Sequence, residues 1–278
     1  MEKEETKEKQ KKKRKLKWQV KLFILIVLIV LYAFFIGTKG IFIREFKVST
    51  SKISDEMHGL KILQISDIHY GSSVIDGMIK KIVKKANETK PDIVIFTGDL
   101  INENHKITNE EKDFLTNELK KINAELGKYY VTGEEDFDDA TSVLNLAGFV
   151  NLENNPQTIY LGSNKPILLI DKSSCKEYFN NTETPPEFKI LALHDPNDID
   201  DLLKYNFDMA IAGHTHNGQI NIIKIKDLLI RGKYNKNYQK VENTKLYINP
   251  GIGTSKIYAR LFNHPTMYLY RLNKTSAN

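Results

Sequence analysis

A stretch of twenty residues, WQVKLFILIVLIVLYAFFIG from Trp18 to Gly37, contains a single charged side chain, Lys21, which lies near its start. Twenty residues of α-helix rise about 30 Å, which is roughly the thickness of the hydrocarbon core of a bilayer. A helix buried in a soluble core would normally carry a polar face, and this stretch has none after Lys21. The stretch therefore predicts a transmembrane helix that is retained as an anchor.

Two alternatives stay open for this stretch. A cleaved signal peptide has a shorter apolar core and ends in small residues, whereas this stretch ends FFIGTKGIF without an A-x-A-like site. A soluble helix is the other alternative. We favour the anchor because both the length and the flanking residues fit it better.

The net charge of +6 is confined to the beginning of the chain. Up to Lys21 there are ten Lys or Arg and four Glu, and the rest of the chain holds 31 basic and 31 acidic residues. A neutral domain argues against a nucleic-acid partner. Because the basic cluster precedes the span and only Lys39 and Arg44 closely follow it, we expect the amino terminus in the cytoplasm. The basic head is interpreted as a topology signal, with at most a weak contact to anionic lipid.

These features divide the chain into four parts. They are a basic cytoplasmic head (1–17), a transmembrane anchor (18–37), a connector (38–45) and a folded domain (46–278). We expect a single-pass protein of the cell membrane with its folded domain outside the cytoplasm. The length and the apolar content of 41% suffice for one substantial core. The single Cys175 allows no internal disulfide, and nothing in the sequence indicates an oligomeric state.

Short apolar runs alternate with amphipathic stretches in the folded part. We expect strands at 42–50, 60–66, 92–98 and 128–133, and helices at 73–87, 110–126 and 138–146. Further strands are expected in FVNLE, TIYLG, ILLID, FKILALH, FDMAIAGH, GQINII, KLYIN and TMYLYRL. The pattern predicts an α/β domain with at least one mixed sheet, and ligands bind such sheets at the carboxyl ends of the strands.

Acidic and histidine side chains follow the expected core strands at the points where those strands end. They are Asp67, His69, Asp99, Glu134, Glu135, His194, His214 and His216. Carboxylate and imidazole groups together suit Mn, Fe or Zn. Two such ions about 3.5 to 4 Å apart can polarise a phosphoryl group and activate water. The sequence therefore predicts a site for two divalent metal ions at this edge.

The spacing within two of the motifs favours this interpretation. Asp67 and His69 are two residues apart, and in an extended segment their side chains would point the same way, toward one ion. His214 and His216 could each reach one ion from a loop. Other roles stay open, since Asp67 and Asp99 could simply cap a turn or a helix and the histidines could be surface residues.

The motifs ISDIHYG, FTGDL, LALHDP and IAGHTHNGQ, with the tail NPGIGTSKIYAR, resemble the calcineurin-like metallophosphoesterase superfamily. They are most similar to its membrane-associated bacterial branch, the YkuE-like phosphoesterases. The resemblance extends from about Phe46 to Leu272 and rests on five ordered motifs, DxH, GD, GNHD, H and GHTH, each at the end of a strand. It implies an αββα sandwich of two mixed sheets flanked by helices, preceded here by the transmembrane helix.

The resemblance also implies roles for individual residues. The ligands implied for the first metal are Asp67, His69 and His216, and those for the second are His194 and His214, with Asp99 bridging both. Arg260, in the tail motif, either contacts a substrate anion or is a surface charge, and the sequence does not decide between these.

The third motif departs from the family pattern GNHD and reads GEED, from Gly133 to Asp136. Glu134 replaces an asparagine ligand of the second metal, which is tolerable because a carboxylate is a stronger ligand than an amide. Glu135 replaces a histidine that lies beside the substrate in the family. As a candidate catalytic acid Glu135 would have to be protonated, and His105 is an alternative donor.

The expected function is a membrane-anchored hydrolase that cleaves a phosphoester, phosphodiester or pyrophosphate bond by two-metal activation of water. A pseudo-phosphoesterase that binds metal or a phosphorylated ligand without turnover is the alternative, and a binding or structural use of the metals is a third. The short connector would hold the site near the bilayer, so we expect the membrane as a partner and a small phosphorylated substrate, and the hypothesis of a lipid-linked one is favoured. The sequence identifies neither the substrate nor the native metal.

Overall fold

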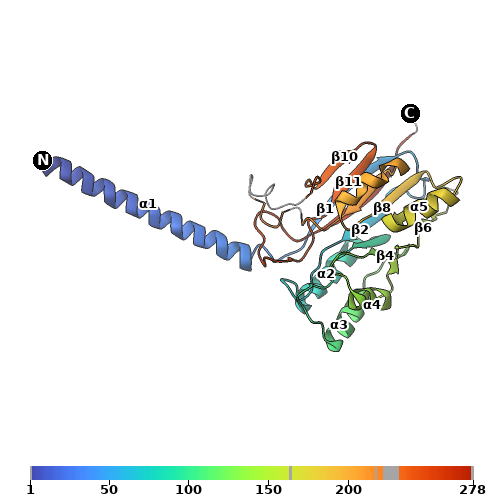
Figure 1. Cartoon of the computed structure of the whole chain (residues 1–278), viewed down its shortest axis with the longest axis horizontal. Helices are drawn as coiled ribbons and strands as arrows, with labels where there is room; N and C mark the ends of the chain where they lie inside the picture. Colours follow the sequence, from blue (N-terminus) through green and yellow to red (C-terminus); the bar gives the residue numbers. More distant parts are fainter. Residues whose placement is uncertain (1, 163–164, 217, 222–231, 277–278) are drawn as a thin grey trace.

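A computed structural model describes residues 2–162, 165–216, 218–221 and 232–276. Helix α1 (Glu2–Phe35) projects from the folded domain as a single element that includes both the basic head and the apolar stretch (Figure 1). Its part Lys11–Phe35 is long and apolar enough to cross a bilayer, by length and composition alone. Almost none of this part is buried inside the molecule, so α1 is not a core helix of the domain.

The described strands form two sheets of six strands each. The first sheet has, in spatial order, β1 (Phe42–Thr50), β12 (Thr266–Lys274), β2 (Lys61–Ile65), β3 (Ile93–Thr97), β4 (Lys128–Val131) and β5 (Val150–Asn151). The second has β10 (Tyr238–Val241), β11 (Thr244–Ile248), β9 (Met209–Ala212), β8 (Phe188–Ala192), β7 (Ile167–Asp171) and β6 (Gln157–Ile159). Both sheets are mixed, since β12 runs antiparallel to β2, and the edge strands β6 and β10 run antiparallel to their neighbours.

Helices cover the outer face of each sheet, and a separate core fills the space between the sheets. Helices α2 (Asp76–Thr89), α3 (Asn109–Leu119) and α4 (Asp138–Leu146) pack on the first sheet through one buried cluster. Helix α5 (Lys172–Asn181) and the 3-10 helix η1 (Pro196–Tyr205) pack on the second. Apolar side chains of both sheets meet in the cluster between them, which includes Ile95 and Ile190. The expected αββα sandwich is confirmed.

Some expected boundaries differ from the observed ones. The helix expected at 110–126 ends at Leu119, because Asn87 of α2 binds the backbone of Lys121 and Asn123 and holds that segment outside the helix. Helix α2 begins at Asp76 rather than at residue 73. Strand β1 spans Phe42–Thr50 as expected and starts opposite Thr266, so residues 42–45, which we also counted in the connector, belong to the sheet.

Three short elements were not expected from the sequence. Asp171 accepts a hydrogen bond from the Ser173 amide and starts α5, and Asp195 does the same for the Asn197 amide at the start of η1. The strand β10 was also not expected. The strand expected over GQINII lies partly outside the described residues, and its described part makes only an isolated bridge between Ile220 and Leu261.

The carboxyl end of α1 packs directly against the domain. The Arg260 amide donates to the Ala33 carbonyl at 2.9 Å, and Ala33 lies in a small apolar cluster with Ala259 and Leu261. Gly37 lies at the same contact, since a Cβ added there would come within 2.0 Å of the Arg260 carbonyl oxygen. The helix end therefore meets the domain at closely packed backbone.

Gly37→Val is expected to separate α1 from this segment. Overpacking of this kind typically costs about 1 to 3 kcal/mol, so the Arg260 and Leu261 amides should exchange hydrogen faster in the full chain. Gly77→Ala in α2 is the control, because its Cβ would meet no atom within 4 Å. Equal exchange protection of residues 259–261 in both variants would contradict the packing described here.

Candidate metal centre

The candidate ligands at the strand ends share an unusual backbone conformation. Five of them have positive φ: Asp67 (48°), His69 (46°), Asp99 (60°), His214 (63°) and His216 (48°). This left-handed region is sparsely populated by residues other than glycine, and strain of this kind gathers at functional sites. The expectation that Asp67 and His69 lie in an extended segment is therefore wrong.

Backbone hydrogen bonds between neighbouring loops hold these turns. The Asp67 amide donates to the Gly98 carbonyl at 2.9 Å, and the His69 amide donates to the Asp99 carbonyl at 3.0 Å. Two glycines allow the loops to approach, since a Cβ on Gly133 would lie 2.1 Å from Asp99 Oδ1 and one on Gly213 would lie 2.4 Å from Asp67 Oδ2. The side chains converge because tight turns follow the strands, not because they alternate along an extended strand.

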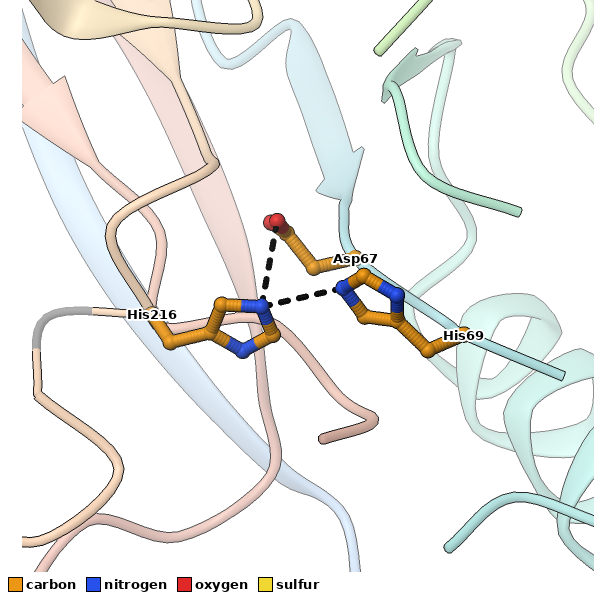
Figure 2. Close-up of side chains that lie close together, drawn as sticks. All are labelled: Asp67, His69 and His216. Carbon is orange, nitrogen blue, oxygen red and sulfur yellow. Dashed lines mark hydrogen bonds and ion pairs between the residues drawn. The ribbon is translucent and has the colours of Figure 1, made fainter. Parts of the chain in front are cut away.

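A first group of ligand atoms comprises Asp67, His69 and His216, all buried. Figure 2 shows the two imidazole rings pointing toward each other beside the carboxylate. His216 Nε2 lies 3.0 Å from His69 Nε2 and 3.6 Å from Asp67 Oδ1. Nitrogen and oxygen atoms that converge so closely suit a cation between them.

A second group comprises Glu134, His194 and His214. His214 Nδ1 lies 2.8 Å from Glu134 Oε1, and His194 Nε2 lies 2.7 Å from Glu134 Oε2. Among the described residues, the buried His194 Nε2 makes no hydrogen bond of acceptable geometry despite this short distance. Its other nitrogen, Nδ1, lies 2.8 Å from the Thr97 carbonyl, which orients the ring. A buried nitrogen oriented in this way fits a metal ligand.

Asp99 lies between the two groups. Its Oδ2 is 3.6 Å from His69 Nε2 and 3.3 Å from His194 Nε2. The carboxylate of Asp136 fixes the turn by accepting from the Asp99 and Leu100 amides, both at 2.7 Å. The seven expected metal ligands are thus brought to one place, and Asp99 is the carboxylate that lies near a histidine of each group.

The shifted pKa values of the histidines also support a site for cations. Burial lowers the pKa of His194, but the Asp99 and Glu134 carboxylates offset this and raise it well above its usual range. Burial, with the neighbouring His69 and Arg260, holds the pKa of His216 well below its usual range, so this imidazole keeps a free lone pair. A site that combines clustered carboxylates, which attract positive charge, with a neutral imidazole is suited to bind divalent cations.

Glu135 lines the same cavity as His69 and Asp99, but its carboxylate is already engaged. Its Oε2 is 2.9 Å from His69 Nδ1 and accepts a hydrogen bond from the Glu103 amide at 2.9 Å. The buried carboxylate therefore lies behind His69, on the ring nitrogen opposite the one that faces His216. Carboxylates in this position commonly fix the tautomer and orientation of a metal-binding histidine.

Arg260 is fully buried, which excludes the surface charge that the sequence left open. Its Nη2 donates to the Gly253 carbonyl at 2.6 Å and to the Pro250 carbonyl at 2.8 Å, and lies 3.4 Å from His216 Nδ1. The position of Arg260 beside His216 was not foreseen from the sequence. The alternative acid His105 instead pairs with Glu111 at 3.2 Å.

A cavity of about 530 Å³ opens over both groups. Its lining includes candidate ligands of both groups together with Gln219, Ile220, Ser255, Lys256 and Ile257. Its size suits a small phosphorylated group.

The two mixed sheets and the carboxylate and imidazole groups at their edge define a metal-dependent phosphoesterase. The family model for the calcineurin-like phosphoesterases matches residues 60–218, and the chain belongs to this family. Members of the family bind divalent metals and hydrolyse phosphoesters, so the chain is classed as a phosphoester hydrolase.

Curated relatives extend this match. An uncharacterized metallophosphoesterase of Bacillus subtilis, YkuE, is 28% identical over 260 residues, covering 88% of this chain and 90% of that protein. The UDP-2,3-diacylglucosamine pyrophosphatase LpxG of Chlamydia muridarum is 26% identical, covering 77% and 84%. A transmembrane protein with metallophosphoesterase domain of Danio rerio is 24% identical, covering 77% and 53%. The expected YkuE-like branch is confirmed.

Proposed function

We propose that this protein is a membrane-anchored phosphoester hydrolase that uses two divalent metal ions. The position of the Asp99 carboxylate, within 3.6 Å of one histidine from each ligand group, carries the proposal. A carboxylate shared in this way is suited to bridge two ions. Asp67, His69 and His216 would hold one ion, and Glu134, His194 and His214 the other.

When bound, a pair of divalent ions would polarise the phosphoryl oxygens and activate a water molecule. The chain's own residues set the geometry. Glu135 holds His69 through Nδ1, which leaves Nε2 directed into the site. Arg260 supports His216 from behind, and Thr97 does the same for His194 through its carbonyl. Glu134, in place of an amide ligand, adds one negative charge to the second group.

We further propose that α1 anchors the protein with its amino terminus in the cytoplasm and its catalytic domain outside. The apolar stretch and the asymmetry of basic residues support this arrangement. A relative whose name describes a UDP-2,3-diacylglucosamine pyrophosphatase supports a lipid-linked phosphoester or pyrophosphate as the substrate class.

The alternative is a pseudo-phosphoesterase that binds metal or a phosphorylated ligand without turnover. One observation favours it, since Glu135 occupies the motif position of the family histidine and its carboxylate is already engaged by His69 and the Glu103 amide. Both contacts use Oε2, and in a pseudoenzyme Oε1 would not serve as an acid for a leaving group. Catalysis would then depend on a substrate whose leaving group needs no acid.

Two measurements on the purified full chain distinguish the hydrolase from the pseudoenzyme. They are elemental analysis of bound metal and Mn-supplemented hydrolysis of an activated aryl phosphodiester. We expect about two metal ions per chain and hydrolysis that a chelator abolishes. Bound metal without hydrolysis of this or any lipid-linked phosphoester would favour the pseudoenzyme. Absence of bound metal would contradict both proposals.

A further inference from the structure

The segment Ser255–Phe262, called here the rim segment, lies between the end of α1 and the metal centre. On one side its Arg260 amide is bonded to Ala33 in the last turns of α1. On the other side Ser255, Lys256 and Ile257 line the cavity over the metal centre. The same short segment thus contacts both the proposed membrane helix and the mouth of the site.

The rim segment exposes large apolar side chains. Ile257, Tyr258 and Phe262 are 48%, 46% and 65% exposed. Phe35 at the end of α1 and Ile36 directly after it are exposed as well. Exposed apolar side chains gathered on one segment and on the adjoining helix end are typical of surfaces that bind a partner or a membrane. A tyrosine among them suits the level of the lipid headgroups.

Basic side chains lie beside this apolar surface. Arg44, Lys236 and His264 line a second cavity, of about 490 Å³, together with Phe42 and Phe262. The described residues that line it include no Asp or Glu. Apolar side chains flanked by Lys and Arg are typical of surfaces that dip into a bilayer while their charges contact anionic headgroups.

We propose that the rim segment docks on the bilayer in which α1 is embedded, so that the cavity over the metal centre opens at the level of the lipid headgroups. The bilayer is the occupant that fits best, because the rim segment is bonded to the last turns of α1 and so lies on the side of the domain from which α1 projects (Figure 1). This inference rests on the proposed anchoring. It adds that the domain itself is oriented on the membrane, which a flexible tether alone would not achieve.

The orientation has a consequence for substrate choice. A phosphoryl group attached to a lipid would reach the cavity without leaving the bilayer surface. Lys256 and Ile257 on the cavity wall would then contact the headgroup and the start of the lipid chain. The proposed substrate class, a lipid-linked phosphoester, would therefore be selected by position as well as by chemistry.

Lipid-borne quenching of a single fluorophore tests the docking. The full chain is placed in nanodiscs of phosphatidylcholine and phosphatidylglycerol that carry a nitroxide lipid. Cysteines introduced as Tyr258→Cys and Tyr160→Cys are labelled, and the native Cys175 is buried and does not compete. Tyr160 is the matched control, since it is exposed and follows β6, which lies on the side of the domain away from α1 (Figure 1).

We expect several-fold stronger quenching at position 258 than at position 160. Equal quenching at the two positions, or none at either, would overturn the docking, and a protein partner would then be the occupant to seek. Co-elution of the chain with the nanodiscs reports the anchoring separately. Neither readout requires hydrolysis, so failure of the docking and failure of the proposed activity are distinguishable.

A second measurement addresses substrate selection. Phe262→Ser is expected to slow hydrolysis of a phosphoester embedded in the nanodisc severalfold and to leave hydrolysis of a soluble aryl phosphodiester unchanged. Tyr160→Ser should change neither rate. An equal fall of both rates in Phe262→Ser would contradict a role of this surface in presenting lipid.

Discussion

Asp99→Asn is expected to lower the rate of phosphodiester hydrolysis about a thousandfold. Metal ions supply several kcal/mol of transition-state stabilisation, and about 4 kcal/mol corresponds to this factor. Asp99 is the carboxylate within 3.6 Å of both histidine groups, so its loss should weaken both metal positions together. An amide keeps the size of the side chain while removing the charge that would bridge the ions.

Metal-induced stabilisation gives a second readout that needs no substrate. A ligand present at about 100 times its Kd stabilises the folded state by about 2.7 kcal/mol, so Mn²⁺ should raise the melting temperature of the wild-type chain. This rise should largely disappear in Asp99→Asn. Asp113→Asn removes one exposed carboxylate from α3 and is the control. A full metal response in Asp99→Asn would contradict a shared carboxylate.

Glu135→Ala is expected to weaken metal binding about 10- to 100-fold, as is typical when the partner of a metal-binding histidine is removed. The variant leaves His69 Nδ1 and the Glu103 amide without their acceptor, so the ring can rotate away from the site. Titration of Mn²⁺ by calorimetry, and the Mn²⁺ concentration that gives half-maximal hydrolysis, should both shift by this factor.

The hydrolysis rate of Glu135→Ala at saturating Mn²⁺ shows whether Glu135 positions His69 or acts on the substrate. If Glu135 acts only through His69, most of the lost rate should return at high Mn²⁺. Unchanged metal affinity combined with a permanently low rate would show instead that Glu135 acts on the substrate. Glu125→Ala, which removes an exposed carboxylate that takes no part in these contacts, controls for charge.

Much of the fold was predictable from local pattern. The continuous apolar run of β3 and the alternation of apolar stretches with helices predicted most of the elements and their order, but not α5, η1 and β10. Boundaries were less predictable where distant residues intervene. Helix α3 ends at Leu119 because the Asn87 side chain of α2 hydrogen-bonds to the Lys121 carbonyl. This contact joins two distant segments, so no local sequence pattern predicts it.

In the metal centre, too, the residues were predictable from the sequence and their arrangement was not. Its residues could be recognised because each follows a strand end, where side chains of a sheet gather. Their geometry could not be predicted from the sequence, because Asp67 and His69 converge through left-handed turns. Hydrogen bonds to the loop of Gly98 and Asp99 hold these turns. An extended segment was the natural expectation, and it is wrong because contacts between loops override the local preference.

The sequence by itself determined the long apolar helix, the α/β class and the identity of the candidate ligands, because hydropathy, periodicity and residue chemistry are local properties. Only the tertiary structure decided that Glu135 binds His69 across 66 positions of the chain and that Arg260 is buried beside His216. It also decided that α1 meets the rim segment, whose first residues line the cavity. These features depend on which distant segments pack together, and burial and partners exist only once they have packed.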